Sequence, residues 1–137
     1  EGVEIVAQQD GKATRTDSMA VMENILTANP DVDLVYGVNY DTGAGAASAI
    51  EAAGSDAIVV CNAWGEEGFK KLEDNDPYIK CMAASSPVTQ AQDAIDAIEP
   101  ALAGEELPKE TLSHSTLLTA DNIDEFDWES IVAARAE

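Results

Sequence analysis

Polar side chains that could bind a ligand follow each of four apolar, strand-like runs in the sequence. Amides and carboxylates form paired hydrogen bonds with vicinal hydroxyl groups, and a flat aromatic ring covers the apolar face of a sugar. The residue types are therefore typical of a site for a neutral, polyol-like ligand. They are Gln8, Gln9 and Asp10 after the first run, Asn39, Tyr40 and Asp41 after the second, Asn62 and Trp64 after the third, and Ser85 and Ser86 after the fourth.

Part of this set also has a purely structural interpretation. Asn, Asp and Ser are common helix caps and turn residues, so capping accounts at least as well for Asp10, Asp41 and Ser86. Capping does not account for Tyr40 and Trp64, whose alternative role is packing beneath a loop. Both interpretations stay open at this stage.

Groups for catalysis are missing or poorly placed. The single histidine, His114, lies in a stretch away from the strand ends, where a surface or edge position is expected. No Ser–His or Cys–His pair is placed for acyl transfer, and no Cys/His cluster has zinc-ligand spacing. Asp10 and Asp41 are the remaining candidates for an acid–base pair, without other support. We therefore predict a non-enzymatic protein with no cofactor and no metal.

Composition narrows the class of protein further. The 137 residues include 27 Asp and Glu but only 7 Lys and Arg, which gives a formal charge of −20. Binding to a nucleic-acid backbone needs clustered cations, so we predict no nucleic-acid partner. No apolar run approaches the roughly 20 residues of a membrane span. Cys61 and Cys81 both lie in apolar runs, which favours two buried thiols over a bridge between neighbouring strands.

Strand-like and helix-like runs alternate along the chain. Such alternation predicts an α/β fold with a parallel sheet and helices on both faces. Ligands bind beyond the carboxyl ends of the strands in such a sheet, where the polar residues above would gather. Strands are expected at residues 3–7, 33–38, 57–61, 79–84 and 111–118, and helices at residues 14–28, 43–53, 66–73, from Pro87 to a kink or end at Pro100, and 121–134.

Two blocks of the sequence carry a family resemblance. Residues 29–36 (NPDVDLVY), Asn39 and residues 45–54 (GAASAIEAAG) form the first block. Residues 104–111 (GEELPKET) and 117–126 (LLTADNIDEF) form the second. Together they resemble type I periplasmic sugar-binding proteins, the solute receptors of ABC importers, such as the ribose-binding kind. The resemblance covers nearly the whole chain.

The resemblance implies a particular domain organisation. Members of this family have two α/β lobes that clamp a ligand between them, and a full protein is about twice this length. Residues 1–137 would then be a single α/β lobe, the second of the two, and the chain would be part of a longer or processed protein. Residues 87–112 would belong with the first lobe.

The helix that begins at Pro87 would then lack its usual cover. Its apolar face carries Val88, Ala91, Ile95 and Ile98. An exposed stripe of that size is a liability in solution. We hypothesise that a second copy of the chain covers it, in a homodimer through residues 87–104, or that a rearrangement does.

The resemblance also implies roles for individual residues. Asn39 matches the sugar-contacting Asn of the family, whereas Tyr40 replaces the Asp that follows it. Asn62-Ala63-Trp64 stands where the family has a Gly-Phe-Asp-like motif, so that Trp64 occupies the Asp position. Because these departures alter the recognition set, the ligand need not be ribose or another pentose and could be a non-sugar. The expected ligand-binding residues are Asn39, Trp64, Tyr40, Asp10, Gln8, Asn62 and Ser85, of which Ser85 corresponds to a family Gln and Gln8 and Asp10 lie near a cleft-lining segment.

Two functions fit this resemblance. The first is an extracytoplasmic solute receptor, in the periplasm or lipid-anchored at the cell surface, that binds a sugar-like small molecule and docks on the membrane permease of an ABC importer. The alternative is the effector-binding domain of a lactose-repressor-type transcription regulator, which shares this fold and would carry a basic helix-turn-helix upstream. A charge of −20 argues mildly against a domain that works near DNA.

Overall fold

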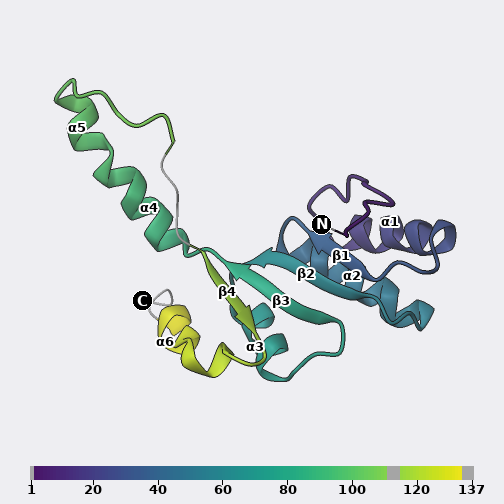
Figure 1. The fold of residues 1–137 in the computed structure, drawn as a ribbon. Helices are drawn as coiled ribbons and strands as arrows, with labels where there is room; N and C mark the ends of the chain where they lie inside the picture. The colour runs from purple at the N-terminus through teal and green to yellow at the C-terminus, as the bar shows by residue number, and fades with distance from the viewer. Residues whose placement is uncertain (1, 111–114, 134–137) are drawn as a thin grey trace.

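The computed structural model describes residues 2–110 and 115–133, which form a twisted sheet flanked by helices (Figure 1). The side chains of residues 131–133 are not described. In chain order the elements are α1 (Arg15–Ala28), β1 (Leu34–Gly37), α2 (Tyr40–Ala53), β2 (Ile58–Ala63), α3 (Glu66–Glu73), β3 (Ile79–Ala84), α4 (Pro87–Asp96), α5 (Ile98–Leu102), β4 (Thr116–Thr119), the 3-10 helix η1 (Ile123–Glu125) and α6 (Trp128–Ala133).

The four strands form one mainly parallel sheet in the order β1-β2-β3-β4. The first three strands are parallel, and β4 runs antiparallel to β3. β4 reverses direction because the chain re-enters the sheet at the end where β3 leaves it, as the 2.6 Å contact between Ser85 Oγ and Ser115 Oγ shows. A parallel partner would need a crossover to the opposite end. The predicted α/β class is confirmed.

The core lies between one face of the sheet and the helices. Cys61 on β2 is the register partner of Met82 on β3, so the two side chains share a face. α2 and α3 pack on that face through glycines: a Cβ at Gly43 would lie 3.0 Å from Cys61 Cβ, and one at Gly68 would lie 2.9 Å from Met82 Sδ. α1 packs in turn on α2. The largest fully buried side chains are Phe69, Met22, Ile50, Leu72, Ile79, Met82, Leu118, Ile123 and Val59.

The opposite face of the sheet is more open than the sequence predicted. Leu34, Tyr36 and Leu117 are exposed, Tyr36 at 61% and Leu117 at 63%. The sequence predicted helices on both faces, whereas α2 and α3 use the same one in the part of the chain that is described.

The first predicted strand is wrong. Residues 3–7 form no strand, and Val3 and Ile5 are 89% and 79% exposed. Their apolar, β-branched character favours a strand, but a strand also needs a neighbouring edge whose backbone groups it can pair with. Within the described residues β1 pairs only with β2, and residues 3–7 do not reach its free edge.

Capping residues determine where α1 and α2 begin and where α2 ends. Thr14 caps α1, with its Oγ1 accepting from Asp17 N at 3.2 Å, as the sequence predicted. α2 begins three residues earlier than the expected 43, because Asn39 and Thr42 form a reciprocal capping box. Gly54 ends α2 with φ +63°, in the left-handed conformation expected of a C-terminal glycine.

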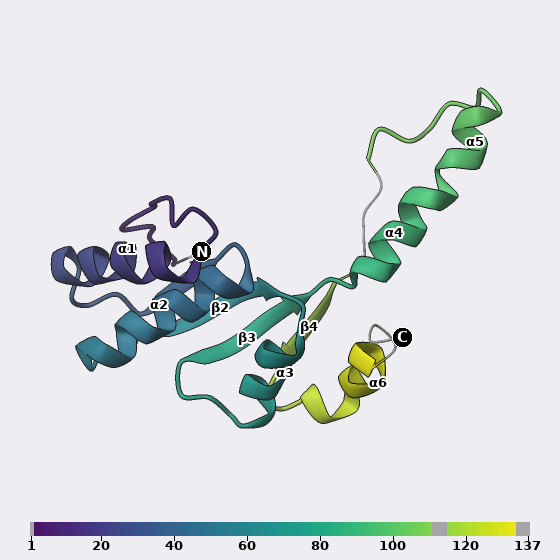
Figure 2. The ribbon, with the colours of Figure 1, turned by 180° about the vertical axis from the view of Figure 1, so that it is seen from behind.

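α4 and α5 extend away from the sheet in both views (Figures 1 and 2). The predicted break near Pro100 is confirmed, since α4 ends at Asp96 and α5 starts at Ile98. Pro100 has no N–H to donate to the Asp96 carbonyl, which interrupts the helix there. No side chain within these two helices is buried.

The end of the chain differs from its prediction. The helix expected at residues 121–134 is divided into η1 and α6, because Asp127 Oδ1 accepts from Ser130 N at 3.3 Å and starts a new helix. The strand expected at residues 111–118 is present from Thr116. Residues 111–114, including His114, lie outside the described residues.

Both cysteines are free thiols. Val60, not Cys61, is the register partner of Cys81, so the two thiols point to opposite faces of the sheet and cannot form a disulfide there. Burial raises the pKa of Cys61 to about 11, so the thiol stays protonated and unreactive. None of the helices described is long and apolar enough to cross a bilayer.

Candidate ligand-binding cleft

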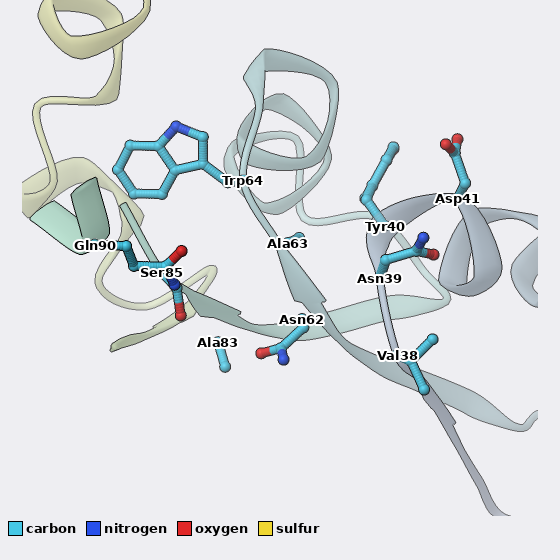
Figure 3. Close-up of a pocket in the computed structure, with 10 residues that line it drawn as sticks. All are labelled: Val38, Asn39, Tyr40, Asp41, Asn62, Ala63, Trp64, Ala83, Ser85 and Gln90. Atoms are coloured by element: carbon cyan, nitrogen blue, oxygen red, sulfur yellow. The ribbon is translucent and has the colours of Figure 1, made fainter. Parts of the chain in front are cut away.

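An open groove of about 360 Å³ lies at the carboxyl ends of β1, β2 and β3 (Figure 3). The ends of parallel strands meet at one edge of a sheet, so residues distant in sequence converge there. The groove is lined by Val38, Asn39, Tyr40, Asp41, Asn62, Ala63, Trp64, Ala83, Ser85 and Gln90. Neutral amides and hydroxyls dominate its polar groups, as expected for a polyol-like ligand.

Five of the seven predicted ligand-binding residues come together in this groove: Asn39, Tyr40, Asn62, Trp64 and Ser85. The other two, Gln8 and Asp10, are exposed in the leading segment and do not line it. Asp10 instead accepts a hydrogen bond from Lys12 N at 2.8 Å. Their expected position depended on a strand at residues 3–7, which does not form.

Asn39 is held firmly at the mouth of the groove. Its Oδ1 accepts from Thr42 N at 2.8 Å, and its Nδ2 donates to the Ala13 carbonyl at 3.3 Å. The amide therefore has both a capping role and a link to the loop before α1. One Oδ1 lone pair and one Nδ2 hydrogen remain for a ligand.

Asn62 and Trp64 point to opposite sides of the strand ends. Figure 3 shows the Asn62 amide on the same side as Ala83, with the Trp64 ring on the other side. The pairing of Asn62 with Ala83 in the register accounts for their shared side. Trp64 follows the last residue of β2, so strand alternation does not apply to it, and its ring packs on Phe69 and Phe126 instead. A ligand that contacts both residues must therefore sit across the strand ends.

Trp64 is also part of an aromatic cluster. Its ring packs edge-on against Phe69, with centroids 5.5 Å apart, and against Phe126, with centroids 6.1 Å apart. Its Nε1 is buried and has no hydrogen-bond partner in the described part of the chain. The packing role that the sequence left open is therefore present, and Trp64 combines it with a place in the groove wall.

Tyr40 lines the groove but sends its hydroxyl away from solvent. Its ring packs against α3, where a Cβ at Gly68 would lie 3.1 Å from the ring. The hydroxyl is buried without a hydrogen-bond partner among the described residues. Burial, together with the negative charge of Glu67, raises the pKa of Tyr40 above its ordinary value, so the phenol stays neutral.

Sequence reasoning missed Arg15 and Gln90. Gln90 reaches the groove from the first turn of α4. Arg15 forms two hydrogen bonds to Glu67, at 3.0 and 2.9 Å, and one to Asp41 at 3.2 Å. These partners lie 52 and 26 residues away along the chain, so no local pattern could have indicated them.

The groove holds no arrangement that suggests catalysis. Asp10 and Asp41 have separate partners, Lys12 N and Arg15, and are not combined into an acid–base pair. Across residues 2–110 and 115–133, no cluster of three or more His, Cys, Asp or Glu side chains is placed to hold a metal ion. The site is suited to holding a ligand by hydrogen bonds and an aromatic face.

Comparison with known proteins identifies related sequences. Residues 1–106 match the family described as periplasmic binding protein domain. The ribose import binding protein of Salmonella typhimurium is 31% identical over 93 residues, which cover 68% of this chain and 29% of that protein. The D-apiose import binding protein of Actinobacillus succinogenes is 35% identical over 97 residues, which cover 68% of this chain and 30% of that protein.

A solved structure agrees with these matches. It is the periplasmic binding protein component of the arabinose ABC transporter from Shewanella sp. ANA-3, bound to α- and β-L-arabinofuranose. The TM-score is 0.74 at 26% identity, over 96% of this chain and 45% of that chain. The present chain thus spans less than half of this structure and about 30% of the curated relatives it matches.

Proposed function

This chain belongs to the periplasmic binding protein domain family, and we propose that it supplies one lobe of a sugar-binding receptor of an ABC importer. The groove at the ends of three parallel strands carries the proposal, since neutral amides, a hydroxyl and an indole line it. Relatives named as ribose and D-apiose import binding proteins support the sugar class.

The polar groups of the groove match the chemistry of a monosaccharide. Asn39, Asn62 and Gln90 each offer both a donor and an acceptor, as vicinal hydroxyl groups require. The carboxylate that lines the groove, Asp41, is paired with Arg15, so the site offers little net charge to an ionic ligand. A neutral sugar is therefore favoured over a phosphorylated one.

The whole receptor would act by closure of two lobes, without catalysis. Ligand binding would draw the other lobe over this groove, and the closed form would dock on the permease outside the cytoplasm. Residues 87–112 would belong with the other lobe in this arrangement. The extension of α4 and α5 away from the sheet, with no buried side chain within them, supports that assignment (Figure 2).

Isothermal titration calorimetry on the full-length protein that contains this chain tests the proposal. D-ribose, D-apiose and L-arabinose are titrated separately, and saturable one-to-one binding of at least one sugar is expected. Asn62→Ala should weaken that binding about tenfold, which corresponds to about 1.4 kcal/mol for lost hydrogen bonds to the ligand. Asn24→Ala, on the exposed side of α1, is the matched control and should leave it unchanged. Absence of binding with all three sugars, and with the hexoses D-glucose and D-galactose, would refute the sugar assignment.

A further inference from the structure

Arg15 lies where the first turns of three helices meet. It is the first residue of α1 and bonds Asp41 in the first turn of α2 and Glu67 in the first turn of α3. The bond to Glu67 is bidentate, with Nη1 to Oε1 at 3.0 Å and Nη2 to Oε2 at 2.9 Å. Such a fork fixes the orientation of both groups, not only their separation.

The two carboxylates held by Arg15 lie in the first turns of α2 and α3, close in sequence to the groove residues Tyr40 and Trp64, which we call the Tyr40 wall and the Trp64 wall. Asp41 directly follows Tyr40 at the end of β1, and Glu67 lies three residues beyond Trp64 at the end of β2. The guanidinium carbon also lies 5.7 Å from the centroid of the Tyr40 ring. Arg15 thus connects the Tyr40 wall with the Trp64 wall without lining the groove itself.

Tyr40 depends on this connection for its position. Its hydroxyl is buried beside Glu67, and its ring lies against the guanidinium and packs on Gly68. The Arg15 side chain is 46% exposed, and the side chains of Asp41 and Glu67 are 56% and 55% exposed. Exposed ion pairs add little to global stability. The network therefore acts on local geometry more than on the folded state as a whole.

We infer that Arg15 is a positioning residue that sets the separation of the Tyr40 and Trp64 walls and thereby the affinity of the cleft for its sugar. The effect on affinity rests on the proposed function. The effect on the walls themselves does not, because it exists in the ligand-free protein. Lysine cannot reproduce the bidentate fork, so Arg15→Lys should preserve only part of the effect.

Hydrogen exchange in the ligand-free, full-length protein tests the positional claim. Arg15→Gln and Glu67→Gln should each speed exchange in the first turns of α2 and α3, over residues 40–44 and 66–70, and Arg15→Lys should fall between them and the wild type. Lys71→Gln is the matched control, because Lys71 pairs with Asp76 at 2.6 Å and does not line the groove. Its effect should be confined to residues 74–79.

Calorimetry with D-ribose, D-apiose and L-arabinose tests the functional consequence. Arg15→Gln should weaken binding of the best-bound sugar about tenfold, because a small displacement of the groups in a site causes a large loss of their effect. Arg15→Lys should recover part of this loss, and Lys71→Gln should stay within about twofold of the wild type. Wild-type exchange rates in Arg15→Gln, or faster exchange with unchanged affinity, would overturn the inference. If the wild type binds none of the sugars, the proposed function fails, and the exchange rates alone decide the role of Arg15.

Discussion

Ser85 and Ser115 share a hydrogen bond of 2.6 Å between their hydroxyl oxygens, although 30 residues separate them. Ser85 follows β3 and Ser115 precedes β4, so this contact brings together the two ends of the segment that contains α4 and α5. The segment leaves and re-enters the sheet at one point, beside the groove. This arrangement suits a connection to another lobe, because its removal would not interrupt the sheet.

Deletion of residues 87–110 should leave the rest of the lobe folded. The two ends of the deleted segment lie close together at Ser85 and Ser115, and no side chain within α4 or α5 is buried. We expect an unchanged far-UV circular dichroism shape, after allowance for the lost helices, and a melting temperature within about 5 °C of the parent, equivalent to about 1 kcal/mol. Loss of cooperative unfolding would show that the segment stabilises the sheet.

The isolated 137-residue chain should form a homodimer through residues 87–104. Val88, Ile95 and Ile98 are each more than half exposed along this segment, which favours burial against a second copy. Light scattering should give a dimer mass for the chain and a monomer mass for Ile95→Glu. A monomeric wild type whose α4 amides exchange freely would contradict this prediction.

Replacement of Trp64 should affect both stability and ligand binding. The ring packs on Phe69 and Phe126, so Trp64→Ala should lower the free energy of unfolding by about 2 kcal/mol in urea titrations. It should also greatly reduce the fluorescence change on sugar binding. Trp64→Phe separates the two roles, since it keeps most of the packing and removes the indole. Unaltered sugar affinity in both variants would remove Trp64 from the site.

Asp76 should make the stability of the lobe depend on pH in the acid range. Burial by itself would raise the pKa of Asp76, but Lys71 and the backbone amides of Ile79 and Tyr78 outweigh it and hold that pKa below its usual value. A depressed folded-state pKa contributes stability that is present above the unfolded value of about 3.9 and is lost as the pH falls through the folded value.

Chemical denaturation between pH 3 and pH 7 measures this contribution. The wild-type free energy of unfolding should fall below about pH 4, and Asp76→Asn should show a flatter profile in that range with a lower value at pH 7, by about 2 kcal/mol. Equal slopes for the two proteins would show that Asp76 does not carry the acid dependence.

Local sequence patterns predicted those helices and strands whose formation depends mainly on their own residues. The helix at residues 66–73 and the strand at residues 79–84 match their predictions to the residue. The helix carries Phe69 and Leu72 on a single face, and the strand is apolar except for Lys80. Residues 3–7 have an equally good strand pattern, yet they form none because they do not reach the free edge of β1. A strand depends on its neighbour, which its own sequence does not describe.

The same distinction explains the candidate site. Asn39, Asn62 and Ser85 could be placed in one groove because they lie at the ends of strands that the sequence predicted to within two residues, and parallel strands end at one edge. Asn62 itself lies inside β2, which ends at Ala63 and not at the predicted residue 61. Gln8 and Asp10 were placed by the strand that does not form. The hydrogen bonds from Arg15 to Asp41 and Glu67 join residues distant in sequence, so only the folded structure reveals them.

The side-chain amide resonances of the full-length protein test the central claim most directly. Nitrogen-15 correlation spectra are recorded with and without the best-bound of D-ribose, D-apiose and L-arabinose. The side-chain amides of Asn39, Asn62 and Gln90 should shift on saturation, and that of Asn24 should not. A sugar that binds while these three resonances stay in place would contradict the account, because the ligand would then lie outside the groove at the strand ends.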